Sequence, residues 1–344
     1  MKVMNTPRSV DIDITNRCNL RCKYCYHFSG PGDVAEDLPA AEWLQFFEEL
    51  NRCAVMNVTL AGGEPFFRKD LKQLIEGIVE NKMRFNVLSN GTLITDDMVE
   101  FLASTGRCDG VQVSIDGSRP ETHDACRGKG NFGKAMDGIE CLQRHGMPVQ
   151  IRVTVHRHNV RDLEGIAQLL LDQVGLPGFS TNAASYMGLC KQNVEDVGLS
   201  TEDRTEDVGL STEDRTFAMD TLLKLNKRYN NRISANAGPL AEAAMWPEME
   251  RARRNGNETI PDRGRLTACG CVMDKIAVRA DGVIVPCTML SHIELGRINK
   301  DDLKEVWQNH PEMQKMRERQ NIPLSDFEFC QGCEYINYCI GNCP

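Results

Sequence analysis

The chain lacks any hydrophobic run long enough to cross a membrane. None of its 344 residues lies in a stretch that approaches 18 consecutive apolar positions, and the N-terminus has no signal-peptide core. Neither a membrane-spanning nor a secreted protein is expected, so the sequence predicts a cytoplasmic protein.

The chain also lacks an excess of basic residues. Forty lysines and arginines stand against 49 aspartates and glutamates, which gives a formal net charge of −9. This balance argues against nucleic acid or an anionic membrane as the main partner. The 41% hydrophobic and 26% charged residues are typical of a globular protein, and the length allows a full-sized core plus a second module.

Cysteine, in contrast, is abundant and unevenly placed. Fifteen cysteines in a cytosolic chain are not a disulfide framework, because that compartment keeps thiols reduced. Five are scattered and are expected to be buried, inert thiols. The other ten gather near the two ends of the chain, which indicates metal binding. The scattered five are Cys53, Cys108, Cys126, Cys141 and Cys190.

The first group lies in "TNRCNLRCKYCYHF", residues 15–28, with the spacing C-x-x-x-C-x-x-C. A structural zinc site would need a fourth ligand close by. Three thiolates, Cys18, Cys22 and Cys25, suit a [4Fe–4S] cluster that leaves one iron open for another ligand. Tyr24 would shield such a cluster from water. The motif resembles the signature of radical S-adenosylmethionine (SAM) enzymes, in which the open iron chelates the methionine part of the cofactor.

Strand and helix patterns alternate after this motif. The expected strands lie in 9–15, 57–65 (a strand with its exit loop), 84–91, 110–117, 149–159 and 178–185, and helices follow the first five. Six strand–helix units predict an α/β fold with a parallel sheet, and they are too few for a closed eight-stranded barrel. We therefore expect a partial TIM-like (β/α)6 barrel over 1–188. Polar or glycine-rich motifs end four of its strands, so one rim should carry the chemistry.

The middle of the chain, 189–266, is polar and is expected to be a helical linker or insert. Within it "EDVGLSTEDRT" occurs twice in tandem, at 195–205 and 206–216. An identical copy of eleven residues is not a solenoid repeat, which needs several units of at least about 20 residues. We interpret it as a recent duplication or an artefact in a surface segment without function.

The C-terminal part, 267–344, combines a hairpin keyed by Asp281–Gly282 with the run "CQGCEYINYCIGNC". This combination resembles the SPASM domain, a twin-cluster extension of radical SAM enzymes. The resemblance implies one auxiliary cluster on Cys269 and Cys271 (either or both), Cys287 and Cys343. It implies a second on Cys330, Cys333 and Cys339, whose last ligand normally lies further downstream. Zinc on these pairs is the alternative.

The resemblance also implies a mechanism and ligand roles. A flavodoxin or ferredoxin would reduce the first cluster, and cleavage of SAM would give a 5′-deoxyadenosyl radical that abstracts hydrogen from the substrate. Gly62 and Gly63 would let the backbone approach the methionine ammonium, with Glu64 balancing its charge. Hydrogen bonds to ribose and carboxylate are assigned to Ser89, Asn90, Ser114 and Asp116, and a carboxylate pairing to Arg127.

Structural alternatives stand beside these roles. Gly62–Gly63 and Asp116–Gly117 are also turn pairs, Ser89 and Ser114 can cap loops, and Arg127 can be a solvated surface charge. The histidines near the rim are expected to be turn residues, namely His123, His156 and His158. Cys126 is expected to be structural, although a thiol at that place can also donate hydrogen to a substrate radical.

The auxiliary clusters favour a maturase of a ribosomally made peptide that forms a thioether or carbon–carbon crosslink. A sulfatase-maturing enzyme is a rival, but it expects an aspartate directly after the hairpin cysteine, where this chain has Thr288. A tetrapyrrole or quinone-cofactor maturase and a non-enzymatic iron–sulfur or zinc scaffold are further alternatives. Only about eight residues precede the first strand, so we expect a separate leader-peptide-binding protein or direct binding in the barrel mouth.

Overall fold

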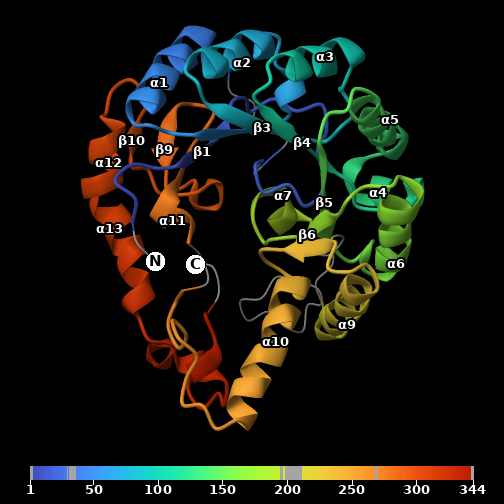
Figure 1. The fold of residues 1–344 in the computed structure, drawn as a ribbon, viewed down its shortest axis with the longest axis vertical. Helices are drawn as coiled ribbons and strands as arrows, with labels where there is room; N and C mark the ends of the chain where they lie inside the picture. The colour runs from blue at the N-terminus through green and yellow to red at the C-terminus, as the bar shows by residue number, and fades with distance from the viewer. Residues whose placement is uncertain are drawn as a thin grey trace.

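The computed structural model describes residues 3–28, 30, 36–193, 197, 211–267 and 270–341. A single ten-stranded sheet organises them, in the order β10-β9-β8-β1-β2-β3-β4-β5-β6-β7 (Figure 1). The strands are β1 Ser9–Asp13, β2 Asn57–Ala61, β3 Arg84–Ser89, β4 Cys108–Ser114, β5 Val149–Val155, β6 Phe179–Ala183, β7 Ile233–Ala235, β8 Lys275–Val278, β9 Val283–Val285 and β10 Gly296–Arg297.

The six predicted strand–helix units are confirmed. Strands β1 to β6 are parallel neighbours in chain order, as successive strand–helix units require. Helices cover the outside of this curved sheet (Figure 1). They are α1 Ala40–Arg52, α2 Leu71–Glu80, α3 Asp96–Ser104, α4 Pro120–Arg127, α5 Asn131–Arg144 and α6 Leu163–Ala167, with η1 Pro65–Phe67, η2 Val160–Asp162 and η3 Gln168–Gln173 as short turns.

The core lies between the sheet and these helices. Trp43, Phe46 and Phe47, which the helical spacing assigned to a buried stripe, are all fully buried. Alternate residues of the strands, such as Ile12 and Val153, join the same apolar cluster. Because side chains alternate across a strand, the residues between them face the inside of the curved sheet.

Four strands beyond the expected six extend the sheet, β7 at one edge and β8, β9 and β10 at the other. Strand β7 pairs in parallel with β6, and β8 pairs in parallel with β1 on the other side. No pairing joins β7 to β10 among the described strands, so the barrel stays open, as predicted. The short strand β7 escaped prediction because three residues are too few for a periodic signal.

The middle segment is helical, as expected, and it also contributes to the core. It contains α7 Gly188–Gln192, α9 Thr212–Arg228 and α10 Pro239–Arg254. Leu222 and Leu225 of α9 are buried in the main cluster. The tandem copies lie mostly outside the described residues, but the second one starts α9. There the Ser211 hydroxyl accepts a hydrogen bond from the backbone N–H of Asp214, a helix cap.

The C-terminal region begins with α11 Cys271–Asp274 and the predicted hairpin. Strands β8 and β9 are antiparallel, and Gly282 in their turn has φ +83°, a conformation that favours glycine. Helices α12 Leu303–Asn309 and α13 Pro311–Glu318 follow, and the remaining turns are η4 Thr288–Leu290, η5 Arg319–Asn321, η6 Leu324–Asp326, η7 Glu328–Cys330 and η8 Ile336–Tyr338. None of the helices described is both long and apolar enough to span a membrane.

Candidate functional site

The three N-terminal cysteines lie on one loop, residues 15–28, directly after β1. Cys18, Cys22 and Cys25 form no disulfide, and electrostatic interactions couple the three sulfurs. Burial raises the pKa of Cys18 to about 11 and that of Cys22 to about 12. Buried thiols of this kind become thiolates only when a cation replaces their protons. The donor set therefore fits an iron–sulfur cluster that lacks a fourth protein ligand, and it does not fit a closed zinc site.

Gly62 and Gly63 hold this loop against the end of β2. A Cβ atom at Gly62 would lie 2.4 Å from the carbonyl oxygen of Thr15, and one at Gly63 would lie 2.2 Å from that of Arg17. The N–H of Gly63 donates to Thr15 O at 2.8 Å, and the N–H of Glu64 donates to Arg17 O at 2.9 Å. The two glycines thus have a demonstrable packing role, and contact with the methionine ammonium stays a prediction.

Glu64 connects two of the rim motifs. Its fully buried carboxylate accepts hydrogen bonds from the Ser89 hydroxyl at 2.9 Å and from the backbone N–H of Asn90 at 2.7 Å. Burial raises the pKa of Glu64 to about 7, against the effect of these donors and of the Phe66 N–H. Asn90 in turn donates to Asn19 and lies 3.9 Å from the Cys18 sulfur. These residues support the cysteine loop from the side of β3.

Asp116 and Arg127 form a buried ion pair on the opposite side of the loop. Arg127 Nε donates to Asp116 Oδ2 at 2.5 Å, and Arg127 Nη1 lies 4.0 Å from the Cys22 sulfur. Tyr24 donates its hydroxyl proton to the same Asp116 oxygen. Burial alone would raise the pKa of Asp116, but the charges of Arg127 and two histidines hold it below its ordinary value. Arg127 is thus no solvated surface charge, because it lies buried beside a cluster ligand.

The second Asp116 oxygen is also engaged, since it accepts the N–H of Thr154 at 2.8 Å. Asp116 therefore positions Arg127 and Tyr24, and its hydrogen bond to the cofactor stays a prediction. Tyr24 stacks on His156 with ring centroids 5.4 Å apart, under the Arg127 guanidinium. Shielding of the cluster by Tyr24 stays a prediction. The Ser114 hydroxyl makes no hydrogen bond within the described residues, so it is available to a ligand.

Sequence reasoning missed several polar residues of this inner face. Asn159 is fully buried and donates to the carbonyl oxygens of Asp116 and Thr154, which ties the ends of β4 and β5 together. Within the described residues, His156 Nε2 and Asn182 Oδ1 are buried without hydrogen-bond partners. Orphaned polar atoms of this kind indicate a ligand. The alternation of polar and apolar residues along β5 and β6 was the sequence signal that could have indicated these inward-facing polar residues.

Asp13 is a further missed residue, at the end of β1. Its carboxylate lies 3.6 Å from the Nδ1 atom of His27, and its Oδ1 atom has no partner among the described residues. Burial raises the pKa of Asp13 to about 7, and the nearby Asp11 and Cys287 add to this effect. The electrostatic coupling to Cys287 shows that the end of β1 faces the C-terminal cysteines.

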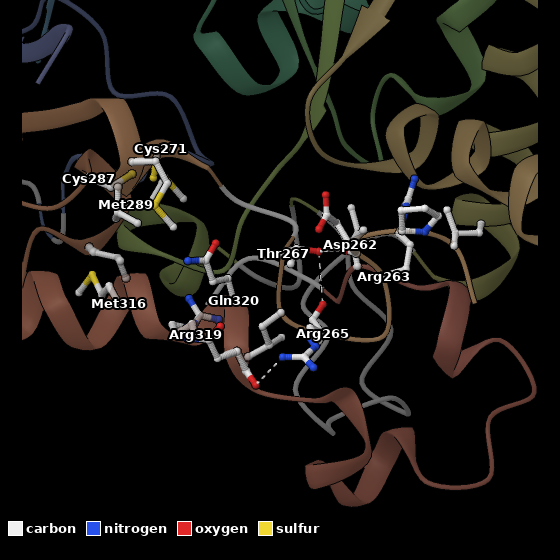
Figure 2. A pocket seen from close by; sticks show the side chains of 18 of the residues that line it. Asp262, Arg263, Arg265, Thr267, Cys271, Cys287, Met289, Met316, Arg319 and Gln320 are labelled. Carbon is white, nitrogen blue, oxygen red and sulfur yellow. Dashed lines mark hydrogen bonds between the residues drawn. The ribbon is translucent and has the colours of Figure 1, made fainter. Parts of the chain in front are cut away.

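The C-terminal cysteines form two groups. Cys271 and Cys287 line a cavity of about 840 Å³, with Met289 and Met316 beside them (Figure 2). Cys330, Cys333 and Cys339 lie elsewhere, and Cys330 interacts electrostatically with both of the others. Cys269 and Cys343 fall outside the described residues. Two separate sulfur groups fit two auxiliary sites better than one zinc site.

The two cysteine regions lie close to one another. Tyr26, directly after Cys25, interacts electrostatically with Cys287 and with the side chain of Thr288. Helix α7 secures the same place, because the N–H of Leu189 donates to Cys25 O at 2.8 Å. The cysteine loop therefore lies between the barrel and the C-terminal hairpin.

Comparisons with known proteins agree with this geometry. A family model described as the radical SAM superfamily matches residues 12–170, and one described as an iron–sulfur cluster-binding domain, SPASM, matches residues 269–334. Fe-coproporphyrin III synthase of Methanosarcina barkeri is 28% identical over 96% of this chain and 81% of its own length. PqqA peptide cyclase of Ruegeria pomeroyi is 24% identical over 98% of this chain and 82% of its own length.

Among solved structures, Streptococcus suis SuiB bound to its precursor peptide SuiA has the same fold. Its TM-score is 0.72 at 17% identity, over 99% of this chain and 72% of that one. SuiB is also known with bound S-adenosylmethionine. The present chain thus has a radical SAM domain over residues 12–170 and a SPASM domain over residues 269–334, and it is an enzyme of [4Fe–4S] clusters and S-adenosylmethionine.

Proposed function

We propose that this enzyme modifies a ribosomally made peptide by forming a thioether or carbon–carbon crosslink. When bound to Cys18, Cys22 and Cys25, the cluster and S-adenosylmethionine supply a hydrogen-abstracting radical. The chain's own residues position this chemistry. Gly63 and Glu64 fix the cysteine loop, and Arg127 is held beside Cys22 by its ion pair with Asp116.

One observation carries the proposal, the proximity of the two cysteine regions. Tyr26, directly after Cys25, interacts electrostatically with Cys287, and the strand that leads into the cysteine loop, β1, pairs with β8 of the C-terminal hairpin. A crosslink requires removal of a hydrogen atom and then of one more electron and one proton from the substrate. A radical site next to an auxiliary site suits such a two-step oxidation, because both act on one bound substrate.

Several relatives with peptide substrates support the same choice. PqqA peptide cyclase and the sporulation killing factor maturation protein SkfB of Bacillus subtilis both match most of this chain. The mycofactocin maturase MftC of Mycolicibacterium smegmatis is 34% identical over 48% of this chain. We further propose a flavodoxin or ferredoxin as the electron donor and a separate protein or the barrel mouth as the site of leader recognition.

A tetrapyrrole substrate is the second candidate. Fe-coproporphyrin III synthase and AdoMet-dependent heme synthase of Methanosarcina barkeri match 96% and 98% of this chain. A sulfatase-maturing activity has less support, because Thr288 occupies the position where that activity expects an aspartate base.

The test is anaerobic reconstitution with iron and sulfide, followed by reduction with S-adenosylmethionine present. One reaction contains the peptide encoded beside the gene, and a parallel reaction contains Fe-coproporphyrin III. Mass spectrometry should show a peptide that has lost two hydrogen atoms. Conversion of Fe-coproporphyrin III with an unchanged peptide would instead assign the tetrapyrrole function. Cleavage of S-adenosylmethionine in neither reaction would refute both.

A further inference from the structure

The inner face of the sheet is polar where a TIM barrel normally packs branched apolar side chains. Residues that alternate with the core positions point to this face. They include Asp11 and Asp13 on β1, Thr59 on β2, Arg84, Asn86 and Leu88 on β3, Gln112 and Ser114 on β4, Arg152 and Thr154 on β5, and Ser180 and Asn182 on β6. A face of this composition is suited to contact a polar ligand.

By this alternation β1–β6 place two arginines on this face, Arg84 at the start of β3, which is paired with Asp109, and Arg152 on β5. The neighbours of Arg152 on β5, Ile151 and Val153, are buried in the core cluster, so its own side chain projects inward. The residue is only partly buried. Its backbone carbonyl accepts the N–H of Ile115, but its guanidinium forms neither a hydrogen bond nor an ion pair with any of the described residues. Burial is the only cause that shifts its pKa, which is lowered, so no acidic group balances the charge.

The other arginines that the fold buries are all paired. Arg68 bonds to Asp70, Arg127 bonds to Asp116, and Arg317 bonds to two backbone carbonyl oxygens. A guanidinium stays charged in proteins, and removing such a charge from water without a partner is costly. The unpaired state of Arg152 is therefore a cost that an anionic ligand would offset.

The position of Arg152 also favours a ligand with a carboxylate. In the strand register Arg152 lies opposite Ser114 on β4 and Ser180 on β6. The Ser114 hydroxyl also makes no hydrogen bond within the described residues. A planar guanidinium beside a hydroxyl matches the two oxygens of a carboxylate, which accept hydrogen bonds from both groups.

Two candidates can supply this carboxylate, S-adenosylmethionine and the substrate. Arg127 is a buried cation beside the cysteine loop, 4.0 Å from the Cys22 sulfur. Arg152 is a second cation, and Asp116, the partner of Arg127, is not among the groups that act on it. One methionine carboxylate needs one guanidinium fork, so the second fork is left for another molecule.

We propose that Arg152, assisted by Ser114, binds a carboxylate group of the substrate and thereby selects acidic substrates. In a peptide this group is an aspartate, a glutamate or the C-terminal carboxylate. The inference rests on the proposed function in taking the substrate to be a peptide. The recognising chemistry is the same for the propionate groups of a tetrapyrrole.

The experiment uses the reconstituted enzyme with Arg152→Gln and Arg152→Lys. The control is Arg52→Gln, which removes an exposed arginine of α1 on the outer side of the fold. The first measurement is cleavage and binding of S-adenosylmethionine without any substrate. Both should stay within about twofold of the unaltered enzyme in all three variants.

The second measurement is modification of the peptide encoded beside the gene. Arg152→Gln should raise KM by about 10- to 100-fold, the usual effect of losing a charge-assisted hydrogen-bonded pair. The KM of Arg152→Lys should lie between those of the unaltered enzyme and Arg152→Gln, because lysine keeps the positive charge but lacks the planar guanidinium fork. Single Asp→Asn or Glu→Gln changes in the peptide, or an amidated C-terminus, remove its carboxylates one at a time. Removal of the carboxylate that binds Arg152 should raise KM for the unaltered enzyme but should not raise it further for Arg152→Gln.

If the enzyme leaves that peptide unchanged, the proposed function fails, and the inference is then tested separately with Fe-coproporphyrin III. The unaltered enzyme should bind this probe by absorbance titration and should not bind its methyl ester, and Arg152→Gln should weaken binding of the free acid. Weaker binding of S-adenosylmethionine in Arg152→Gln would assign the guanidinium to the cofactor and overturn the inference. Unchanged binding of both probes by that variant would overturn it as well.

Discussion

The sharpest prediction concerns Gly63, where the structure leaves no space for a side chain. An alanine Cβ would lie 2.2 Å from the carbonyl oxygen and 2.6 Å from the carbonyl carbon of Arg17. Both are backbone atoms of the cysteine loop, so the conflict is relieved only if the loop moves. Movement breaks the hydrogen bonds from Gly63 N–H to Thr15 O and from Glu64 N–H to Arg17 O.

The magnitude follows from these contacts. Overpacking costs typically about 1–3 kcal/mol, and each lost hydrogen bond about 0.5–1.5 kcal/mol. Gly63→Ala should therefore destabilise the packing of the cysteine loop against the end of β2 by about 2–6 kcal/mol. This is at least a tenfold shift in the equilibrium between the packed and the displaced loop. The N-terminal cluster should be lost, while the C-terminal cysteines keep theirs.

Gly133→Ala is the matched control. It makes the same chemical change in α5, where a Cβ would meet nothing within 4 Å. An alanine within a helix stabilises it by about 0.5–1 kcal/mol relative to glycine.

The assay is iron per chain after anaerobic reconstitution, together with cleavage of S-adenosylmethionine without substrate. Gly63→Ala should contain about four fewer iron atoms per chain and should cleave S-adenosylmethionine more than tenfold more slowly. Gly133→Ala should match the unaltered enzyme in both measurements. Circular dichroism checks that both variants remain folded. Full iron content and unchanged cleavage in Gly63→Ala would refute the assigned role of this glycine.

Three further predictions test other parts of the site. Asp116→Asn should lower the free energy of urea unfolding by about 3–5 kcal/mol, because it leaves the buried Arg127 without its ion partner. Asp109→Asn, at an exposed pair with Arg84, should cost less than about 1 kcal/mol, and similar losses in both variants would contradict the argument. Cys287→Ser should remove about four iron atoms per chain and abolish peptide crosslinking, and it should leave substrate-independent cleavage of S-adenosylmethionine within about twofold. Loss of that cleavage would show that the auxiliary site serves the first cluster. Burial lowers the pKa of His123 from 6.5 to about 4, so its neutral form stabilises the fold above pH 6.5, and this contribution is lost as the pH falls towards 4. The unaltered enzyme should thus lose about 2 kcal/mol more than His123→Asn between pH 7 and pH 5 in urea unfolding, and parallel pH profiles would speak against it.

The order of strands and helices was predictable because it follows from local patterns. Alternating and helical apolar spacing located β1 to β6 and the stripe of Trp43 on α1. Cysteine spacing predicted both cluster regions, since ligand geometry leaves a direct trace in sequence. The boundaries of the three segments at 188 and 266 stay predictions. The middle segment also supplies β7 and buried residues of α9, so it is more than a connection.

The partners of each polar residue could not be predicted, because they are distant in sequence. Asp116 was expected to contact the cofactor, which stays a prediction, and the structure adds that its oxygens accept hydrogen bonds from Arg127, Tyr24 and Thr154. A sequence shows that a carboxylate is present at the end of a strand, but it does not show which groups from other segments form hydrogen bonds with that carboxylate.

The sequence by itself determined that three thiolates follow the first strand and that further cysteines accompany a hairpin near the other end of the chain. Those facts depend only on residue type and spacing. Only the tertiary structure decided that Tyr26 interacts with Cys287, that Gly63 touches Arg17, and that the Arg152 side chain faces inward with no partner among the described residues. Contacts and the absence of contacts between distant segments arise when the sheet curves, and that curvature brings residues together from strands far apart in the chain.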